Sequence, residues 1–340
     1  MKEQLNNFIS EIKQYDSLAI IGLSKNVGKT TSMNEILKLY NFENVSLTSI
    51  GYDGEDSDLI FKTHKPSILI KKGMLLANAK RCVLDSEIRF EILETTSFNT
   101  PLGEIVIVKA LDDGLVKLAG PSHNAQLKKV VELLHEFGGG QVIVDGALNR
   151  KSFANPSVCQ ATLLCTGMTI GKSYDEVAIK TKYTLDLLQI KQVDNDIDLL
   201  KSIENPVTLI NKDLSLDVID VKTSIASENI IASALNKENK YLYINGVLTD
   251  NIAQAIIRNR NRLDDFTIVV DNGTNVFVKE RTLSQLDIAK IKLRVIDPIN
   301  VKAIAINPCD LRQCYDSEIL LNKIEETTGM FAYDFVEGGK

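Results

Sequence analysis

The stretch "AIIGLSKNVGKTTSMNEIL", from Ala19 to Leu37, constrains the fold more than any other part of the chain. An apolar run of strand character comes first, a short glycine-bounded loop follows, and the sequence then takes on helical periodicity. A loop that leaves a strand and opens a helix points several backbone N–H groups at one anion, and the helix N-terminus adds partial positive charge. We therefore predict a phosphate-binding loop between a strand at Ser17–Gly22 and a helix opened by Gly28.

The side chains after Gly28 are those that phosphate chemistry requires. Lys29 is expected to reach the outer phosphates of a nucleotide and to act in catalysis, and Thr30 is expected to bind Mg²⁺. The alternative is an ordinary turn followed by a helix start. The predicted nucleotide-binding residues are Gly22, Asn26, Val27, Gly28, Lys29, Thr30 and Thr31.

The spacing of the two glycines is unusual. The common pattern G-x-x-x-x-G-K-[ST] requires glycine at the position of Leu23, whereas five residues separate Gly22 from Gly28. This spacing resembles that of dethiobiotin synthetases and cobyrinate amidases, which belong to the same branch of P-loop ATPases as nitrogenase iron protein and the MinD family. The signature lysine of the MinD family would fall at Ser24, and we do not transfer its role to the adjacent Lys25. The resemblance favours ATP as the nucleotide.

A phosphate loop needs an acidic residue to hold Mg²⁺ or its waters, and Asp145 is the first candidate. It ends a short apolar strand predicted at Gln141–Asp145. Ligands bind beyond the carboxyl ends of parallel strands, so Asp145 should face the phosphates if this strand neighbours the first. Asp145-Gly146-Ala147 also resembles the acidic-Gly-Ala element of dethiobiotin synthetases. The alternative is an Asp-Gly turn, and we predict a metal-associated role.

The segment "LTSIGYDGEDSD" supplies further acidic residues after a strand predicted at Val45–Ile50. Asp53 or Glu55 is expected to bind Mg²⁺ or to orient the attacking water, and we rank Asp53 first as a catalytic and metal residue. The alternative is a solvated acidic turn. Loop Gly51–Asp58 is also a candidate switch that senses the γ-phosphate. Glu94, at the end of a predicted strand, ranks below Asp53.

Three other features allow a structural as well as a functional interpretation. Ser122 or Asn124 is expected to cap a helix, which makes a structural role for His123 the simpler interpretation. Arg150 is a candidate for stabilising phosphoryl transfer, and the alternatives are a surface charge or part of a partner-binding loop. The segment "LINKDL" lacks the aspartate that a guanine-reading N-K-x-D motif would place at Leu214, so it does not indicate GTP.

Apolar runs alternate with helical patterns through the 340 residues. This predicts an α/β protein: a P-loop domain at 1–200 with a doubly wound, mostly parallel sheet, and a second, smaller α/β domain at 206–340 for partner docking. Polar residues at Lys191–Asn205 mark the boundary. Other strands are expected at Ile88–Leu93, Glu104–Lys109, Ala161–Cys165, Val207–Ile210, Lys240–Ile244, Thr267–Val270, Leu293–Ile296 and Ala303–Ile306. Helices are expected at Ser32–Tyr40, Asn124–Phe137, Asn251–Arg260 and Ser317–Thr327.

Composition excludes several classes of protein. The net charge is −6 and no long basic run occurs, which argues against a nucleic-acid partner. The N-terminal apolar residues follow a helix face rather than a signal peptide, and no apolar stretch is long enough to span a membrane, so a cytoplasmic location is expected. Five cysteines are too few for a disulfide scaffold. A zinc site at Cys309 and Cys314 would need two more ligands, so incidental or buried thiols are expected.

Taken in order, five stretches resemble the ATPase subunit of the lysine 5,6-aminomutase reactivase: "IGLSKNVGKTT", "TSIGYDGE", "LAGPSHNAQL", "VIVDGALNRKSFA" and "TLLCTGMTIG". The resemblance covers Ile20–Gly171, and "AINP" at Ala305–Pro308 is its clearest piece in the second half.

The resemblance implies a function that the residues alone do not reveal. Lysine 5,6-aminomutase uses adenosylcobalamin and pyridoxal phosphate, and it is inactivated when damaged cobalamin stays bound. A reactivase would use ATP and Mg²⁺ to open the mutase so that the damaged cofactor leaves, together with a second, MutS-like subunit. Many ATPases of this branch work as dimers, so a homodimer is among the expected assemblies.

Two other functions stay open. One is a ligase of the dethiobiotin or cobyrinate type, which makes a phosphorylated carboxylate. An amidotransferase domain would need a nucleophilic cysteine with a histidine partner. The three histidines, His64, His123 and His135, all lie in the first half, which weakens that version but leaves a simpler ligase. The other function is a non-catalytic, nucleotide-binding regulator or assembly factor.

Overall fold

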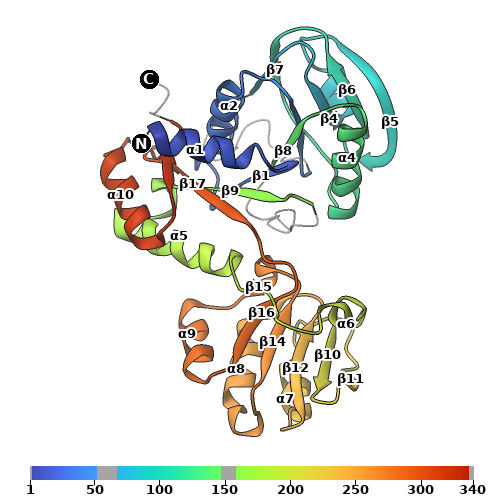
Figure 1. Cartoon of the computed structure of the whole chain (residues 1–340), viewed down its shortest axis with the longest axis vertical. Coiled ribbons are helices and arrows are strands. Elements are labelled where there is room, and N and C mark those ends of the chain that lie inside the picture. The colour runs from blue at the N-terminus through green and yellow to red at the C-terminus, as the bar shows by residue number, and fades with distance from the viewer. Residues whose placement is uncertain (1, 52–66, 147–157, 337–340) are drawn as a thin grey trace. The chain divides into compact units, whose positions relative to one another are not determined.

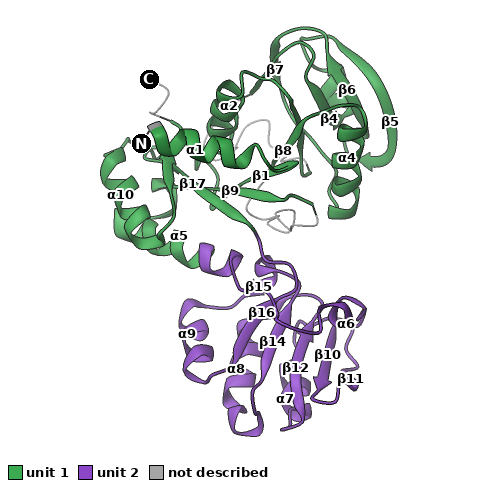
Figure 2. Ribbon diagram, in the orientation of Figure 1, with its two compact units in different colours: residues 1–184, 300–340 green, residues 185–299 purple. Residues whose placement is uncertain are grey.

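The computed structural model describes residues 2–51, 67–146 and 158–336. The chain divides into two compact units, one formed by residues 1–184 and 300–340 and the other by residues 185–299 (Figure 2). Helix α5, Tyr174–Leu188, crosses from the first unit into the second. Both units combine helices with a sheet, which confirms the predicted α/β class.

The first unit is built on a nine-stranded sheet with the order β18-β17-β9-β1-β8-β2-β4-β6-β5 (Figure 1). Strands β18 to β4 in this order run parallel, whereas β6 and β5 are antiparallel to their neighbours. The strands are β1 Ser17–Gly22, β2 Val45–Ser49, β4 Leu75–Ala79, β5 Phe90–Thr100, β6 Gly103–Ala110, β8 Gln141–Asp145, β9 Ala161–Gly167, β17 Val301–Asn307 and β18 Ala332–Asp334. Strands β3 Ile68–Ile70 and β7 Gly114–Val116 form a separate antiparallel pair.

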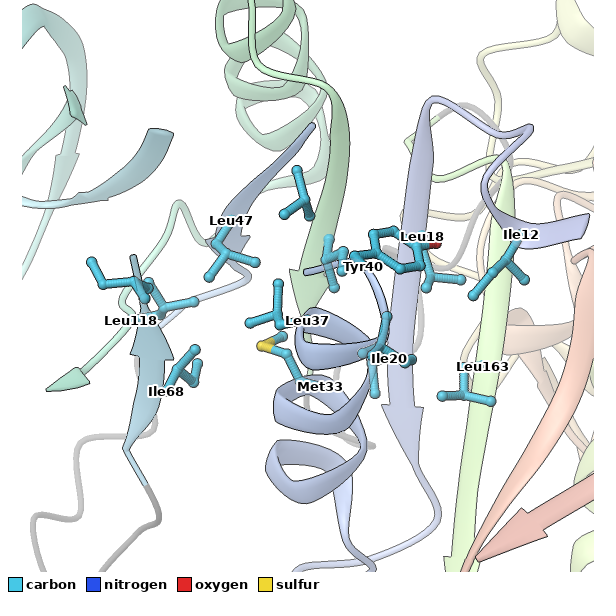
Figure 3. Close-up of a cluster of buried hydrophobic side chains, with 14 of the residues drawn as sticks. Ile12, Leu18, Ile20, Met33, Leu37, Tyr40, Leu47, Ile68, Leu118 and Leu163 are labelled. Atoms are coloured by element: carbon cyan, nitrogen blue, oxygen red, sulfur yellow. The ribbon is translucent and has the colours of Figure 1, made fainter. Parts of the chain in front are cut away.

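The central strands β1 and β8 of this sheet are buried along their whole length. Helices α1 and α2 pack on one face through a cluster that includes Leu18, Ile20, Met33 and Leu37, gathered between α2 and the strands in Figure 3. Burying each such side chain contributes about 1.5–3 kcal/mol. The helices of this unit are α1 Lys2–Ile12, α2 Lys29–Leu39, α3 Lys80–Leu84, α4 Asn124–Glu136, α5 and α10 Ser317–Thr328, with a 3₁₀ turn at Met168–Ile170.

The second unit contains a five-stranded sheet with the order β11-β10-β12-β14-β16. Strands β12, β14 and β16 are parallel, and β10 is antiparallel to both of its neighbours. The elements are α6 Ile197–Lys201, β10 Val207–Asn211, β11 Leu216–Val218, α7 Glu228–Ala234, β12 Asn239–Ile244, α8 Asp250–Arg258, β14 Thr267–Val270, α9 Glu280–Ile288 and β16 Lys292–Val295. A small pair, β13 Leu248–Thr249 with β15 Val276–Phe277, and 3₁₀ turns at Arg260–Arg262 and Gly273–Asn275 complete it.

The extents of the two units differ from the predicted ranges 1–200 and 206–340. The chain leaves the first unit within α5, before the polar stretch that the sequence marks as a boundary. It also returns at residue 300, because β17 pairs with β9 and β18 pairs with β17. The second unit is therefore an insertion between two parts of the first. Such a return depends on strand pairing between distant segments, which local sequence patterns do not reveal.

Gly120 offers a test of the packing at the end of β2. A Cβ atom there would lie 1.6 Å from the carbonyl oxygen of Ser49, which is backbone and cannot rotate away. We expect Gly120→Ala to lower the free energy of unfolding by about 3 kcal/mol or more in chemical denaturation. Gly73→Ala is the matched control. Gly73 has φ +94° but no atom within 4 Å of the new Cβ, so only the backbone penalty of about 1–2 kcal/mol applies. Equal losses in both variants would contradict the contact.

Candidate functional site

The predicted phosphate loop joins β1 to α2. Asn26 has φ 60°, and Gly28, at the N-cap of α2, has φ 86°, so two residues of this short loop are in the left-handed region. Left-handed residues in a turn direct successive N–H groups to one side, which forms an anion-binding concavity. The backbone therefore has the conformation expected of a loop that holds phosphate at a helix N-terminus.

Gly22 allows this loop to fold back over the end of β1. A Cβ atom at Gly22 would lie 2.6 Å from Cγ2 of Val27 and 3.0 Å from Cδ of Lys29. Val27 is buried in the core on the α2 face of the sheet, so it cannot move away freely. The close approach explains why glycine stands at position 22, with five residues rather than four between it and Gly28.

Lys29 is the first residue of α2, and its side chain turns back over the loop. Its Nζ donates a hydrogen bond of 3.4 Å to the carbonyl oxygen of Ser24. At 3.4 Å this bond is long, so an incoming phosphate can replace it at small cost. Thr30 and Thr31 follow in the first helical turn and are partly buried. The ammonium group thus lies beside the loop amides and can neutralise an anion bound there.

Asp145 ends β8, the strand next to β1, as the sequence predicts. It pairs in register with Ile20 of β1 and with Ser49 of β2. The residue is 6% exposed, and its Oδ1 is buried and accepts no hydrogen bond from any residue that the structure describes. Burying a carboxylate oxygen without a partner is costly. Such an atom at the carboxyl end of a parallel strand is suited to receive a cation or its bound water.

The charges of Lys29 and Asp145 both affect the pKa of Cys165. It lies on β9, the other neighbour of β1, opposite Gly22. Burial raises the pKa of its thiol to about 12, while the charge of Lys29 acts to lower that pKa and the charge of Asp145 to raise it. The two charges thus act on the pKa of this thiol in opposite directions. The thiol therefore stays protonated near neutral pH and carries no charge. Its Sγ donates a hydrogen bond to Oγ of Ser32 on α2 at 3.9 Å.

The loop before α4 lies beside the residues that follow β2, to which backbone hydrogen bonds join it. The N–H of Gly51 donates to the carbonyl oxygen of Pro121 at 2.8 Å, and the N–H of Gly120 donates to that of Gly51 at 3.2 Å. The predicted cap at Ser122 or Asn124 is wrong. His123 occupies the N-cap position of α4 in an extended conformation, and its side chain makes no capping hydrogen bond.

Asn307, at the end of β17, contacts the phosphate loop and was missed from the sequence. Its Nδ2 donates to the carbonyl oxygen of Asn26 at 2.7 Å. Its Cβ would lie 3.4 Å from a Cβ at Gly28, and its backbone oxygen lies so close to Gly167 that a Cβ there would approach it to 2.3 Å. The only sequence signal was "AINP", an apolar strand ending in Asn-Pro. The pairing of β17 with β9 is what brings Asn307 to the phosphate loop.

The remaining predicted site residues are either outside the described residues or distant from β1. Asp53, Glu55 and Arg150 lie outside the described residues. Glu94 lies inside β5 rather than at a strand end. Because β5 is the fifth strand from β1 in the sheet order, about 24 Å separates them at the usual strand spacing. The ranking of Glu94 as a site acid is therefore wrong.

The expectation of incidental thiols at the C-x4-C pair is also wrong, because Cys309 and Cys314 form a disulfide. The two residues face each other as an isolated antiparallel bridge, which brings their side chains together. Spacing alone could not distinguish this pairing from two separate thiols.

The donor atoms fit Mg²⁺ bound together with a nucleotide. No group of three or more His, Cys, Asp or Glu residues is arranged for a metal within the described ranges, so a cage made by protein alone is not seen there. Mg²⁺ in nucleotide sites uses one or two protein oxygens besides phosphates and waters. Thr30 and Asp145 supply hard oxygen atoms of this kind.

Comparison with protein-family models finds no match to this chain. Searches of curated proteins and of solved structures find no significant similarity either. No helix in the described part of the chain has the length and apolar character needed to cross a bilayer.

Proposed function

We propose that this chain is a P-loop ATPase that binds Mg²⁺ and ATP and couples the nucleotide to the remodelling of a partner enzyme. One observation carries the proposal. The loop between β1 and α2 combines left-handed Asn26 and Gly28 with the ammonium group of Lys29. The neighbouring strand ends in Asp145, whose buried Oδ1 has no hydrogen-bond partner among the described residues. Backbone amides, a cation and a buried acid at one sheet edge are the parts that phosphoryl transfer requires.

The sheet order supports a doubly wound P-loop fold. Strand β1 lies between β8 and β9. Strands β2, β4, β5 and β6 lie on the β8 side of β1, and the later strands β17 and β18 lie on the β9 side, so the chain changes the direction in which it adds strands at β1. In open parallel sheets, ligands bind beyond the carboxyl ends of the strands at the point where the winding changes direction. The phosphate loop follows β1 at that point, so the candidate site and the preferred ligand position of this topology coincide.

The residues have separable roles in this proposal. The loop amides and Lys29 bind the phosphates, and Lys29 offsets the negative charge that develops on the transferred group. Thr30 and Asp145 would hold Mg²⁺ or its waters, and the ion neutralises the phosphate oxygens when it is bound. Asp53 is assigned from sequence alone to orient water and to sense the γ-phosphate.

The partner assignment rests on the sequence resemblance. We assign the chain to reactivation of an adenosylcobalamin-dependent aminomutase of the lysine 5,6-aminomutase type, in the cytoplasm, with a MutS-like second subunit. The unit of residues 185–299 is assigned to partner docking, because it is an insertion between two parts of the unit that carries the loop between β1 and α2. Neither the nucleotide chemistry nor the fold requires this particular partner.

The proposal is tested by ATP hydrolysis with Mg²⁺, measured with the chain alone and with inactivated aminomutase plus the second subunit. We expect the partner to stimulate hydrolysis and mutase activity to return. Hydrolysis that ignores the mutase but depends on a small carboxylic acid or amine would favour the ligase instead. Binding of ATP without turnover under any condition would favour a regulator.

Asp53→Ala tests the coupling step in the same assay. We expect this variant to bind ATP but to lose the response to the partner, because the acid assigned to sense the γ-phosphate is removed. Glu91→Ala is a suitable control, since Glu91 is an exposed acid on the outer strand β5. Normal hydrolysis and normal reactivation by Asp53→Ala would refute the switch assignment.

A further inference from the structure

The segment between β17 and α10 is a small, closed loop beside the phosphate loop. The disulfide between Cys309 and Cys314 closes it covalently. Inside it, the N–H of Asp310 donates to the carbonyl oxygen of Gln313 at 2.9 Å, and the N–H of Tyr315 donates to that of Pro308 at 3.1 Å. We call residues 308–315 the disulfide loop.

Asn307 joins the disulfide loop to the phosphate loop. Its Oδ1 accepts a hydrogen bond of 3.0 Å from the N–H of Cys309, while its Nδ2 donates at 2.7 Å to the carbonyl oxygen of Asn26. One amide side chain is thus held by a disulfide cysteine on one side and by the left-handed part of the phosphate loop on the other. Its two bonds also fix which end of the amide faces which loop.

Both cysteines of the disulfide are accessible to solvent. Cys314 is exposed and Cys309 is partly exposed. Two of the other three, Cys159 and Cys165, are buried, and burial raises the pKa of both thiols. Cys82, on α3, is partly exposed but is not part of a disulfide. A reductant in solution can therefore reach the Cys309–Cys314 bond.

We propose that Cys309–Cys314 is a redox-modifiable site that controls anion binding by the phosphate loop through Asn307. For the nucleotide as ligand, the inference rests on the proposed function. Disulfides of this exposed kind in proteins of reducing compartments typically serve as sensors or catalysts rather than as scaffolds. The chemical class of the modifying agent is a dithiol reductant.

Reduction proceeds by thiol–disulfide exchange. A thiolate of the dithiol attacks Sγ of Cys314, the S–S bond breaks, and Cys309 leaves as a thiolate that takes up a proton. The second thiolate of the dithiol then attacks the dithiol's other sulfur in the mixed disulfide, and Cys314 leaves as a thiolate that takes up a proton. The protein gains two electrons and two protons, and the dithiol becomes a disulfide.

Reduction acts on the phosphate loop because it frees Cys309. Without the covalent closure the Cys309 N–H is no longer fixed against Oδ1 of Asn307, and the amide loses the contact that orients it. The bond from Nδ2 of Asn307 to Asn26 then weakens. Asn26 is in the strained left-handed region, so its conformation depends on such support.

Two readouts on the full chain test the coupling, in the oxidised form and after treatment with dithiothreitol. Calorimetry measures the Kd for MgADP, chosen because it is not hydrolysed. We expect reduction to weaken binding about 3- to 10-fold, the range for losing one or two supporting hydrogen bonds. Hydrogen exchange measured without nucleotide should show faster exchange of the amides at residues 23–29 in the reduced form.

Three variants separate this mechanism from a general effect of reduction. Cys309→Ser with Cys314→Ser should behave like the reduced protein and ignore dithiothreitol. Asn307→Ala should exchange rapidly at residues 23–29 in both redox states, since the connecting amide is gone. Cys82→Ser is the matched control and should keep the full response.

The outcomes distinguish this inference from the proposed function. Exchange at residues 23–29 that is identical in oxidised and reduced protein would overturn the redox coupling. MgADP binding by neither form, with exchange that still differs, would support the coupling and refute the nucleotide site. An effect of reduction that disappears in Cys82→Ser would overturn the assignment to Cys309–Cys314.

Discussion

Replacing Lys29 with alanine is expected to lower ATP hydrolysis at least 100-fold. The Lys29 ammonium lies beside the loop amides, where its Nζ bonds only loosely to the carbonyl oxygen of Ser24 at 3.4 Å. A positive group held next to a transferring phosphoryl stabilises the charge of the transition state, and losing such a preorganised donor costs about 100- to 1,000-fold in kcat. Steady-state phosphate release, measured at saturating ATP and Mg²⁺, gives kcat directly.

Lys38→Ala is the matched control for this variant. Lys38 lies in the last turn of the same helix, α2, where it pairs with Glu35 and is half exposed. Removing a surface ion pair of this kind costs at most about 1 kcal/mol of stability and should leave kcat unchanged. If Lys29→Ala retains activity within a factor of two of the parent, hydrolysis occurs elsewhere and the phosphate loop is not the ATP site.

Asp145→Asn is expected to separate activity from stability. We expect kcat to fall about 10- to 100-fold and the Mg²⁺ requirement to rise, because a carboxylate that holds the ion or its waters becomes a neutral amide. The free energy of unfolding should stay the same or increase. Oδ1 of Asp145 is buried without a partner among the described residues, and a neutral isostere is less costly to bury than a carboxylate.

Magnesium titrations of hydrolysis and chemical denaturation of the apo protein measure the two effects. Asp112→Asn is the control, since Asp112 is bonded to Arg89 at the far edge of the sheet and Arg89 holds the pKa of that carboxyl down to about 2. The control variant should keep the parental Mg²⁺ dependence. A loss of several kcal/mol in Asp145→Asn with unchanged hydrolysis would mean that Asp145 is a structural residue.

Local patterns in the sequence were sufficient for the elements that carry the site. Strands Ser17–Gly22, Gln141–Asp145 and Thr267–Val270 have the predicted bounds, because a parallel strand buried on both faces is apolar throughout and short enough to end clearly. The predicted strand at Ile88–Leu93 is less accurate. The strand runs from Phe90 to Thr100, since an edge strand with one exposed side carries polar residues that resemble a loop.

The sequence by itself determined the loop that we propose binds phosphate, because its glycines, its lysine and the helix that follows are adjacent in the chain. It also determined that Asp145 ends a buried strand. Only the tertiary structure decided which strands neighbour one another. The insertion of residues 185–299 and the contact of Asn307 with Asn26 both depend on β17 pairing with β9. That pairing joins segments more than a hundred residues apart, and its energy comes from backbone hydrogen bonds and packing that leave no local pattern in the sequence.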